Sequence, residues 1–357
     1  MDIRSTSVRG RGAVGNPANR FERIHLERDS EWNPEDDPAP TTLFFKDASQ
    51  TVITFNDSPD LGFSASVNPY RGCEHGCIYC YARPTHEYLG FSAGLDFESR
   101  IMVKEDAPQR LREALASPKW QPQVISMSGV TDCYQPVERR LKLTRRCLEV
   151  LAEFRNPVTV VTKNHLVTRD LDILGTLAKD QAAAVFISVT TLDAELASRL
   201  EPRTSLPSHR LEAIAQAAKA GIPTGVVVAP IIPAVNDHEI PAILAAAAEA
   251  GARFAGYVVL RLPHGLGPLF EDWLERHLPD RKQKVLNQIR SLRQGKLNDP
   301  NFGSRMRGQG PLAKQIASMF RVAKRRAGIE ERGPDLSVKA FRKPEHKANS
   351  LQQTFPF

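Results

Sequence analysis

The 357-residue sequence has no apolar run near the roughly 20 residues that a helix needs to cross a bilayer, so we expect no membrane span. The N-terminus carries Arg4, Arg9 and Arg11 but lacks the apolar core of a signal peptide. Only five cysteines are present, and three of them lie close together, which argues against a disulfide framework and for a reducing compartment. We therefore expect a cytoplasmic protein.

Positive charge is concentrated near the C-terminus. Lys and Arg against Asp and Glu number 22 and 21 in residues 61–267, but 19 and 9 in residues 268–357. A basic face of this kind often contacts phosphate backbones, so nucleic acid is a candidate partner. A solvated helical surface is the alternative interpretation of the same charge.

Cys73, Cys77 and Cys80 are the most informative residues of the chain. They stand in the stretch from Asn68 to Arg83 with the spacing C-x3-C-x2-C, which supplies three thiolates to one metal centre and no fourth cysteine nearby. Iron–sulfur clusters are usually held by four thiolates. A cluster held by three leaves one iron open to a small molecule, as cluster-assisted chemistry requires.

The alternative is a structural zinc site, with His75 or His86 as the fourth ligand. Sites with three cysteines and one histidine are common for zinc. However, such sites usually present paired C-x2-C units, and this sequence has no second pair. We therefore favour a cluster.

The stretch Asn68–Arg83 resembles the radical S-adenosylmethionine (SAM) enzymes, and among them the spore-photoproduct-lyase-like branch of largely unassigned substrate. The resemblance implies that the three cysteines bind a [4Fe–4S] cluster and that SAM chelates the fourth iron. It further implies reductive cleavage of SAM to a 5′-deoxyadenosyl radical, which removes hydrogen from the substrate. An external one-electron donor, such as flavodoxin or ferredoxin, would supply the electron.

The rest of the sequence predicts an α/β fold. Strand-like runs recur near residues 62–67, 123–128, 157–162, 184–190, 224–231 and 256–262. Helical patterns fill the intervals at 107–116, 137–154, 169–179, 208–220 and 241–250. This alternation predicts right-handed crossovers and a parallel sheet, and the resemblance implies a partial (β/α)6 TIM-type barrel. Such a barrel places its chemistry at the carboxyl ends of the strands.

We divide the chain into five parts. Residues 1–40 are expected to be disordered or loosely attached, 41–64 form an N-terminal extension, and 65–265 form the barrel. A helical, basic region over 266–330 and a weakly ordered tail over 331–357 follow.

The resemblance also implies cofactor contacts at positions that follow the predicted strands or the cysteines. Tyr79 would lie near the SAM adenine, and Thr131 with Asp132 near its amino group. Three further residues would contact the ribose or carboxylate of SAM, namely Lys163, Ser188 and Arg203. The structural alternatives are a core tyrosine, a helix N-cap at Asp132 and surface or capping roles for the others. Glu138 is a second acidic candidate beside Asp132, and Glu201 could orient Arg203.

Tyr81 and Cys133 are the candidates for hydrogen-atom transfer. The run Tyr79-Cys-Tyr81 is similar to that of spore photoproduct lyase, whose tyrosines and a cysteine are implicated in returning a hydrogen atom. This chain departs from the lyase pattern, because it has Gly129 where the lyase cysteine stands and Cys133 on the other side of Asp132. Tyr81 could instead support the loop, and Cys133 could be a core residue.

These motifs together predict a radical SAM enzyme of unidentified substrate, with nucleic-acid repair or modification as one candidate reaction. Arg261 and His264, after the last predicted strand, are candidates on the substrate side. Two other functions stay open at this point. One is an iron–sulfur sensor without turnover, in which Asp132, Lys163 and Ser188 would not converge. The other is a zinc-stabilised nucleic-acid-binding module.

Overall fold

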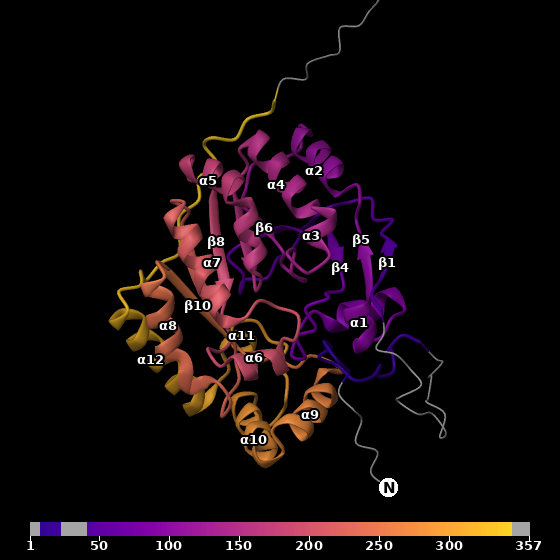
Figure 1. Cartoon of the computed structure of the whole chain (residues 1–357), viewed down its shortest axis with the longest axis vertical. Coiled ribbons are helices and arrows are strands. Elements are labelled where there is room, and N and C mark those ends of the chain that lie inside the picture. Colours follow the sequence, from indigo (N-terminus) through magenta and orange to yellow (C-terminus); the bar gives the residue numbers. More distant parts are fainter. Residues whose placement is uncertain (1–7, 23–40, 345–357) are drawn as a thin grey trace, which may run out of the picture.

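The computed structural model describes residues 8–22 and 41–344 and has one large sheet at its centre (Figure 1). Six strands of this sheet are parallel, in the spatial order β10-β9-β8-β7-β6-β3, and the antiparallel strand β2 follows at one edge. The strands are β2 (Ile53–Phe55), β3 (Ala65–Val67), β6 (Ile125–Met127), β7 (Val158–Thr162), β8 (Ala183–Ser188), β9 (Thr224–Ile231) and β10 (Phe254–Val259). The six predicted strand runs are confirmed, and β10 and β2 remain as the two edges of a partial barrel.

Helices connect successive parallel strands, as the sequence pattern predicted. They are α2 (Ala107–Ala116), α3 (Glu138–Leu141), α4 (Leu143–Phe154), α5 (Leu171–Lys179), α6 (Ala194–Leu200), α7 (Pro207–Lys219) and α8 (Ile240–Glu249). The helix expected over 137–154 is divided into α3 and α4, because Lys142 has a left-handed φ of 52°. Apolar faces of these helices pack on the strands and form the main core, for example Leu148 with Val160 and Val185.

A second sheet of three strands lies beside the cysteine loop, and none of the six predicted strand runs covers it. Its order is β1-β5-β4, with β1 (Leu43–Lys46), β4 (Tyr70–Arg71) and β5 (Arg100–Val103). A 3-10 helix, η1 (Arg83–Leu89), and helix α1 (Leu95–Ser99) connect the loop to β5. Figure 1 shows this sheet on the opposite side of the molecule from α5, α7, α8 and α12.

Residues 8–22 pack against the cysteine loop. Ala13 is fully buried, and the N–H groups of Gly12 and Ala13 donate to the Glu98 carboxylate at 3.0 and 2.9 Å. The backbones approach so closely that a Cβ at Gly12 would lie 1.8 Å from the carbonyl oxygen of Gly76. This packing was not anticipated for the segment expected to be loosely attached, whose residues 1–7 and 23–40 lie outside the described residues.

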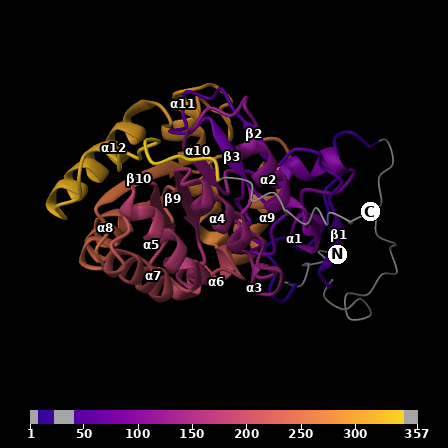
Figure 2. The same ribbon diagram turned by 90° about the horizontal axis from the view of Figure 1, so that it is seen from above.

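The C-terminal region is helical, as predicted. It contains α9 (Leu266–His277), α10 (Lys282–Leu292), α11 (Ser304–Arg307) and α12 (Gly310–Arg326). Helix α12 packs on α8, and Figure 2 shows the two side by side at one end of the molecule. Beyond it, Phe341 packs on Phe154, while residues 345–357 lie outside the described part. No helix within residues 8–22 and 41–344 is long and apolar enough to span a membrane.

Candidate functional site

The three clustered cysteines lie on one buried loop that follows β4. Cys73 and Cys77 are buried and Cys80 is partly buried, and all three are free thiols. The N–H of Cys80 donates to the carbonyl oxygen of Cys77 at 3.2 Å, and the N–H of Cys73 donates to Phe97 at 2.9 Å. Cys80 also packs against the apolar groups around both other cysteines, so the loop gathers the three residues in one place.

A buried ion pair between Arg83 and Glu98 holds the outer side of this loop. Arg83 also donates to the carbonyl oxygens of Cys77 at 3.0 Å and Gly76 at 3.2 Å. Gly76 has a φ of 69°, a backbone conformation that glycine adopts without strain. Because a buried charge is costly unless it is paired, this arrangement fixes the loop only while both partners are present.

The loop suits a cluster better than a single metal ion. Burial raises the pKa of Cys73 and of Cys77 well above the usual value, so these thiolates need a strong positive centre beside them. Among the described residues, no three His, Cys, Asp or Glu side chains have the arrangement that binds one metal ion. Thiolates that bind different irons of a [4Fe–4S] cluster lie farther apart than ligands that share one zinc ion.

The histidines considered as zinc ligands are directed elsewhere. His75 Nδ1 lies 3.4 Å from Asp132 Oδ2, and its Nε2 lies 3.1 Å from the Asn164 side-chain amide. His86 packs on the rings of Phe91 and Phe97, with centroids 5.2 and 5.6 Å away. The zinc interpretation therefore lacks a fourth ligand of the kind it proposed.

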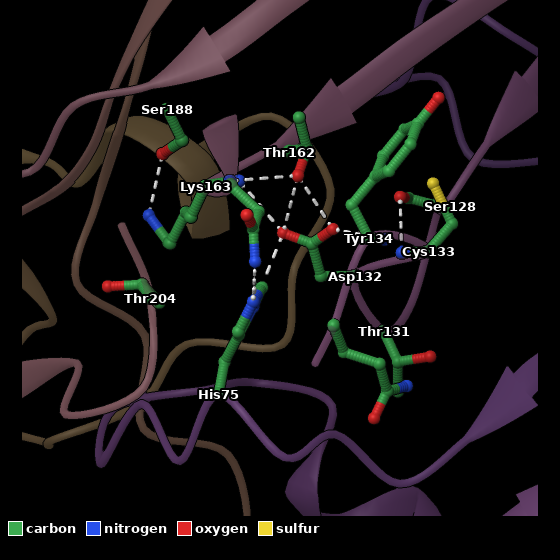
Figure 3. Close-up of polar contacts among 12 residues, drawn as sticks. His75, Ser128, Thr131, Asp132, Cys133, Tyr134, Thr162, Lys163, Ser188 and Thr204 are labelled. Carbon is green, nitrogen blue, oxygen red and sulfur yellow. Dashed lines mark hydrogen bonds and ion pairs between the residues drawn. The ribbon is translucent and has the colours of Figure 1, made fainter. Parts of the chain in front are cut away.

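Asp132 receives hydrogen bonds from three directions at the end of β6. Its carboxylate accepts from the Thr162 hydroxyl at 2.7 Å, the Lys163 N–H at 2.8 Å and the Tyr134 N–H at 2.9 Å (Figure 3). Burial acts to raise the pKa of Asp132, but His75 and these N–H groups outweigh it and hold the pKa below its usual value. The side chain is thus a preorganised anion next to the cysteine loop.

Lys163, at the end of β7, points toward the neighbouring strand ends. Its Nζ donates to Ser188 Oγ at 2.6 Å, Thr190 Oγ1 at 3.1 Å and the Ala229 carbonyl oxygen at 2.9 Å, and Figure 3 shows the contact with Ser188. It also lies 3.2 Å from Glu201 Oε1. Burial lowers the pKa of Lys163 to about 7, and the charge of Arg210 acts in the same direction.

Tyr79 joins this group through its hydroxyl. The Tyr79 ring lies 5.7 Å below Lys163 Nζ, and its hydroxyl donates to Glu201, which is also bound by Arg210. Glu201 thus pairs with Lys163 and Arg210, and the expected partnership with Arg203 is not present. The structure therefore brings Asp132, Lys163 and Ser188 together at the carboxyl edge of the sheet, as their strand-end positions predicted, and Tyr79 reaches them from the cysteine loop.

Three other candidates lie outside this group. Arg203 contacts the cysteine loop from another side, through Glu74 at 3.3 Å. Thr131 is buried, where its Oγ1 donates to the Tyr70 carbonyl oxygen at 3.0 Å. Glu138 accepts from the Tyr70 hydroxyl at 2.5 Å and pairs with Arg169, in a buried network separate from Asp132.

The two hydrogen-transfer candidates differ in environment. Tyr81 is 49% exposed, and its hydroxyl donates to the Gly129 carbonyl oxygen at 2.7 Å. Cys133 is fully buried in the main core, and in Figure 3 its sulfur points away from His75 and Lys163. Tyr81 is thus open to a ligand, whereas Cys133 is enclosed by protein.

Sequence reasoning missed Arg210 and the pair Arg83–Glu98. Arg210 had a signal, because it falls at the same three- and four-residue spacing as the buried Pro207, Ile214 and Ala217 of α7. An arginine in an apolar stripe needs a buried anion, and Glu201 is the nearby acidic candidate. Glu98 had no such signal, since its helix has only five residues.

Comparisons with known proteins agree with this geometry. A family model described as "Radical SAM superfamily" matches residues 67–247. An uncharacterized protein of Mycobacterium tuberculosis is 34% identical over 250 residues, which cover 69% of this chain and 72% of that protein. An uncharacterized protein of Methanocaldococcus jannaschii is 30% identical over 173 residues, 48% of this chain and 62% of that one.

Solved structures of spore photoproduct lyase share the fold. The lyase complexed with dinucleoside spore photoproduct has a TM-score of 0.59 at 18% identity, with 80% of each chain covered. A double mutant of the lyase with bound AdoMet and the same ligand has a TM-score of 0.56 at 18% identity, covering 77% of this chain and 78% of that one.

Proposed function

Because the chain belongs to the radical SAM superfamily, whose cofactors are a [4Fe–4S] cluster and SAM, we propose that it is an enzyme that holds the cluster with Cys73, Cys77 and Cys80. When bound, these cofactors supply a 5′-deoxyadenosyl radical, formed by one-electron reduction and cleavage of SAM, that removes hydrogen from a substrate. The proposed partners are SAM and an external one-electron donor of the flavodoxin or ferredoxin type. The free thiols fit a cytoplasmic enzyme.

The observation that carries the proposal is the contact between the cysteine loop and the strand ends through His75 and Asp132. Asp132 would accept hydrogen bonds from the ammonium group of SAM, because its carboxylate oxygens can each accept more than one hydrogen bond. Lys163 would donate to the SAM carboxylate in exchange for one of its present acceptors, and Ser188 would stay beside it. An iron–sulfur sensor without turnover would not require these three residues to converge.

The remaining candidates have roles in the proposal that differ with their surroundings. Tyr79 would border the SAM adenine, and Arg203 and Thr131 would support the site by holding the two loops in place. Tyr81 is the better placed of the two hydrogen-transfer candidates, because its ring is exposed beside Cys80. Cys133 would need a movement of the core to reach a substrate.

Nucleic acid is the substrate class that we propose. The basic C-terminal region and the exposed aromatic ring of Tyr81 support it, since positive charge and open aromatic faces together suit phosphates and bases. The reaction would be a repair or modification of the lyase type.

The test is anaerobic reconstitution with iron and sulfide, followed by reduction and chromatography of SAM products. We expect 5′-deoxyadenosine from the wild type and a loss to background for Cys77→Ala. Cys147→Ala is the matched control, because this cysteine lies in the apolar core of α4. An intact cluster without cleavage above the Cys77→Ala level would overturn the proposal.

A further inference from the structure

Arg261 is a partly buried guanidinium that forms no ion pair in the described part of the chain. It follows the carboxyl end of β10, and its Cζ lies 5.7 Å from the ring centroid of Tyr81. Its Nη1 donates to the thioether sulfur of Met306 at 3.4 Å, and its Nε is buried without a hydrogen-bond partner. Within residues 8–22 and 41–344 no carboxylate forms an ion pair with it. A charge in this setting is costly unless a ligand pairs with it.

Arg305, on helix α11, is a second guanidinium close to Arg261. The charges of Asp60 and Asp299 act on Arg261, but Asp60 is paired with Arg305, whose Nε donates to Asp60 Oδ2 at 2.5 Å. Burial and the charge of Arg305 lower the pKa of Arg261. The direction of the shift shows that nearby carboxylates do not fully compensate the two positive charges. Arg305 also stacks over Phe302 at 4.4 Å, and Phe302 is 56% exposed.

The segment that carries Arg305 is fixed to the barrel by a buried arginine. Arg293 donates to the carbonyl oxygen of Leu260 at 2.8 Å and to that of Arg305 at 2.8 Å. It therefore connects the carboxyl end of β10 to α11. The Gly- and Arg-rich segment over residues 301–310 is thereby held close to Arg261, which contacts both Met306 and the ring of Tyr81. Tyr81 directly follows Cys80, so the segment lies near the cysteine loop.

We propose that Arg261, Arg305, Tyr81 and Phe302, together called the arginine rim, bind a phosphate group of the substrate beside the cysteine loop. A guanidinium presents a planar set of donors that matches phosphate oxygens, and aromatic faces accept nucleobases. The inference rests on the proposed function, which names the reaction at the cysteine loop. The phosphate site itself is formed by residues other than those proposed to bind the cofactors. The phosphate could belong to a nucleic-acid strand or to a mononucleotide.

The test measures binding to the reconstituted protein without reductant, so that no turnover is needed. Fluorescence anisotropy follows a labelled oligothymidine, and the unlabelled competitors are oligothymidine, thymidine 5′-monophosphate and thymidine. We expect Arg261→Gln to weaken oligothymidine binding about tenfold, the effect of one lost charged hydrogen-bonding group. The dependence of log affinity on log salt should also fall by about 0.7 for the lost phosphate contact. Arg261→Lys should restore part of the affinity.

Arg253→Gln is the matched control. Arg253 lies just before β10, at the other end of the same strand, and pairs there with Glu330. Unchanged affinity in this variant, with a loss in Arg261→Gln, supports the arginine rim. Competition by the monophosphate assigns the phosphate to a mononucleotide, and competition by oligothymidine alone assigns it to a strand.

Equal losses in the two variants, or displacement of the probe by thymidine as strong as displacement by its monophosphate, would overturn the inference. So would an absence of binding by the wild-type protein. This test is independent of the test of the proposed function. SAM cleavage without phosphate binding would refute only the proposed role of the arginine rim. Phosphate binding without SAM cleavage would refute only the proposed radical SAM activity.

Discussion

His75, which stands between Cys73 and Cys77, directs its Nδ1 to the carboxylate of Asp132 at 3.4 Å. This contact joins the cysteine loop to the loop after β6, where the SAM amino group is proposed to bind. This pair of side chains therefore helps to position the two halves of the proposed cofactor site relative to each other, together with contacts such as that of Tyr81 with Gly129. Loss of either side chain should therefore loosen both the cysteine loop and the loop after β6.

Replacement of His75 should loosen the cysteine loop. His75→Ala removes buried hydrogen-bonding partners of Asp132 and Asn164, so we expect a loss of about 1–3 kcal/mol in the free energy of unfolding. Urea denaturation of the cofactor-free protein measures it, and iron per chain after reconstitution should fall in parallel. His209→Ala, an exposed histidine on α7, is the control. Unchanged unfolding and iron content in His75→Ala would contradict a positioning role.

The lowered pKa of Lys163 should make stability depend on pH. Its pKa is about 7 in the folded protein and about 10.4 in an unfolded chain. Between these values the unfolded state binds more protons, so the free energy of unfolding should rise with pH, by up to about 1.4 kcal/mol per unit. Lys163→Met should lack this rise.

Urea denaturation of both cofactor-free proteins at about pH 7 and about pH 9 measures the difference, and the titration of other groups cancels in the comparison. The wild type should gain stability relative to Lys163→Met at the higher pH. Parallel pH profiles of the two proteins would show that Lys163 keeps its ordinary pKa.

The N-terminal segment should protect the cysteine loop. Gly12→Val adds a Cβ that would lie 1.8 Å from the Gly76 carbonyl oxygen, so the segment must move away. We expect a destabilisation of about 1–3 kcal/mol and faster bleaching of the reconstituted cluster in air. Gly62→Val is the control, because a Cβ at Gly62 meets nothing within 4 Å. Identical bleaching rates in the two variants would argue against a protective role.

Thiol accessibility should separate the five cysteines. In the folded, cofactor-free protein Cys80 is partly exposed and the others are buried, so iodoacetamide should modify Cys80 first. Burial raises the pKa of Cys133 well above its usual value, which further disfavours the reactive thiolate. Mass spectrometry of peptides after timed labelling measures the order. Early modification of Cys133 would show that the core opens and would favour its role in hydrogen-atom transfer.

Much of the fold could be predicted because its signals are local. Strands such as β9 are continuous apolar runs, and helices such as α7 show a three- and four-residue period, so the alternation was evident from the sequence. The strand-end positions of Asp132 and Lys163 predicted that these two residues lie close together beside the cysteine loop. These predictions depend on short stretches of chain and on the rule that parallel strands end at one edge.

The contacts that were missed depend on distant parts of the chain. Gly12 carries no sequence signal for its approach to Gly76, since a glycine in a polar segment predicts only flexibility. Arg203 and Glu201 are near in sequence, which suggested a pair, but Glu201 is turned toward Arg210 and Lys163. Side-chain partners inside a buried network are decided by tertiary packing, and sequence proximity does not reveal them.

The buried pair Arg83–Glu98 has an evolutionary consequence. Each residue alone would leave an uncompensated charge against the backbone of the cysteine loop, so neither can be exchanged first without a penalty of about 3–5 kcal/mol. Lineages that diverge from this chain should accordingly keep both residues or replace both together. Conservation of both residues, at positions 83 and 98, would then identify homologues in which the same buried ion pair holds the cysteine loop.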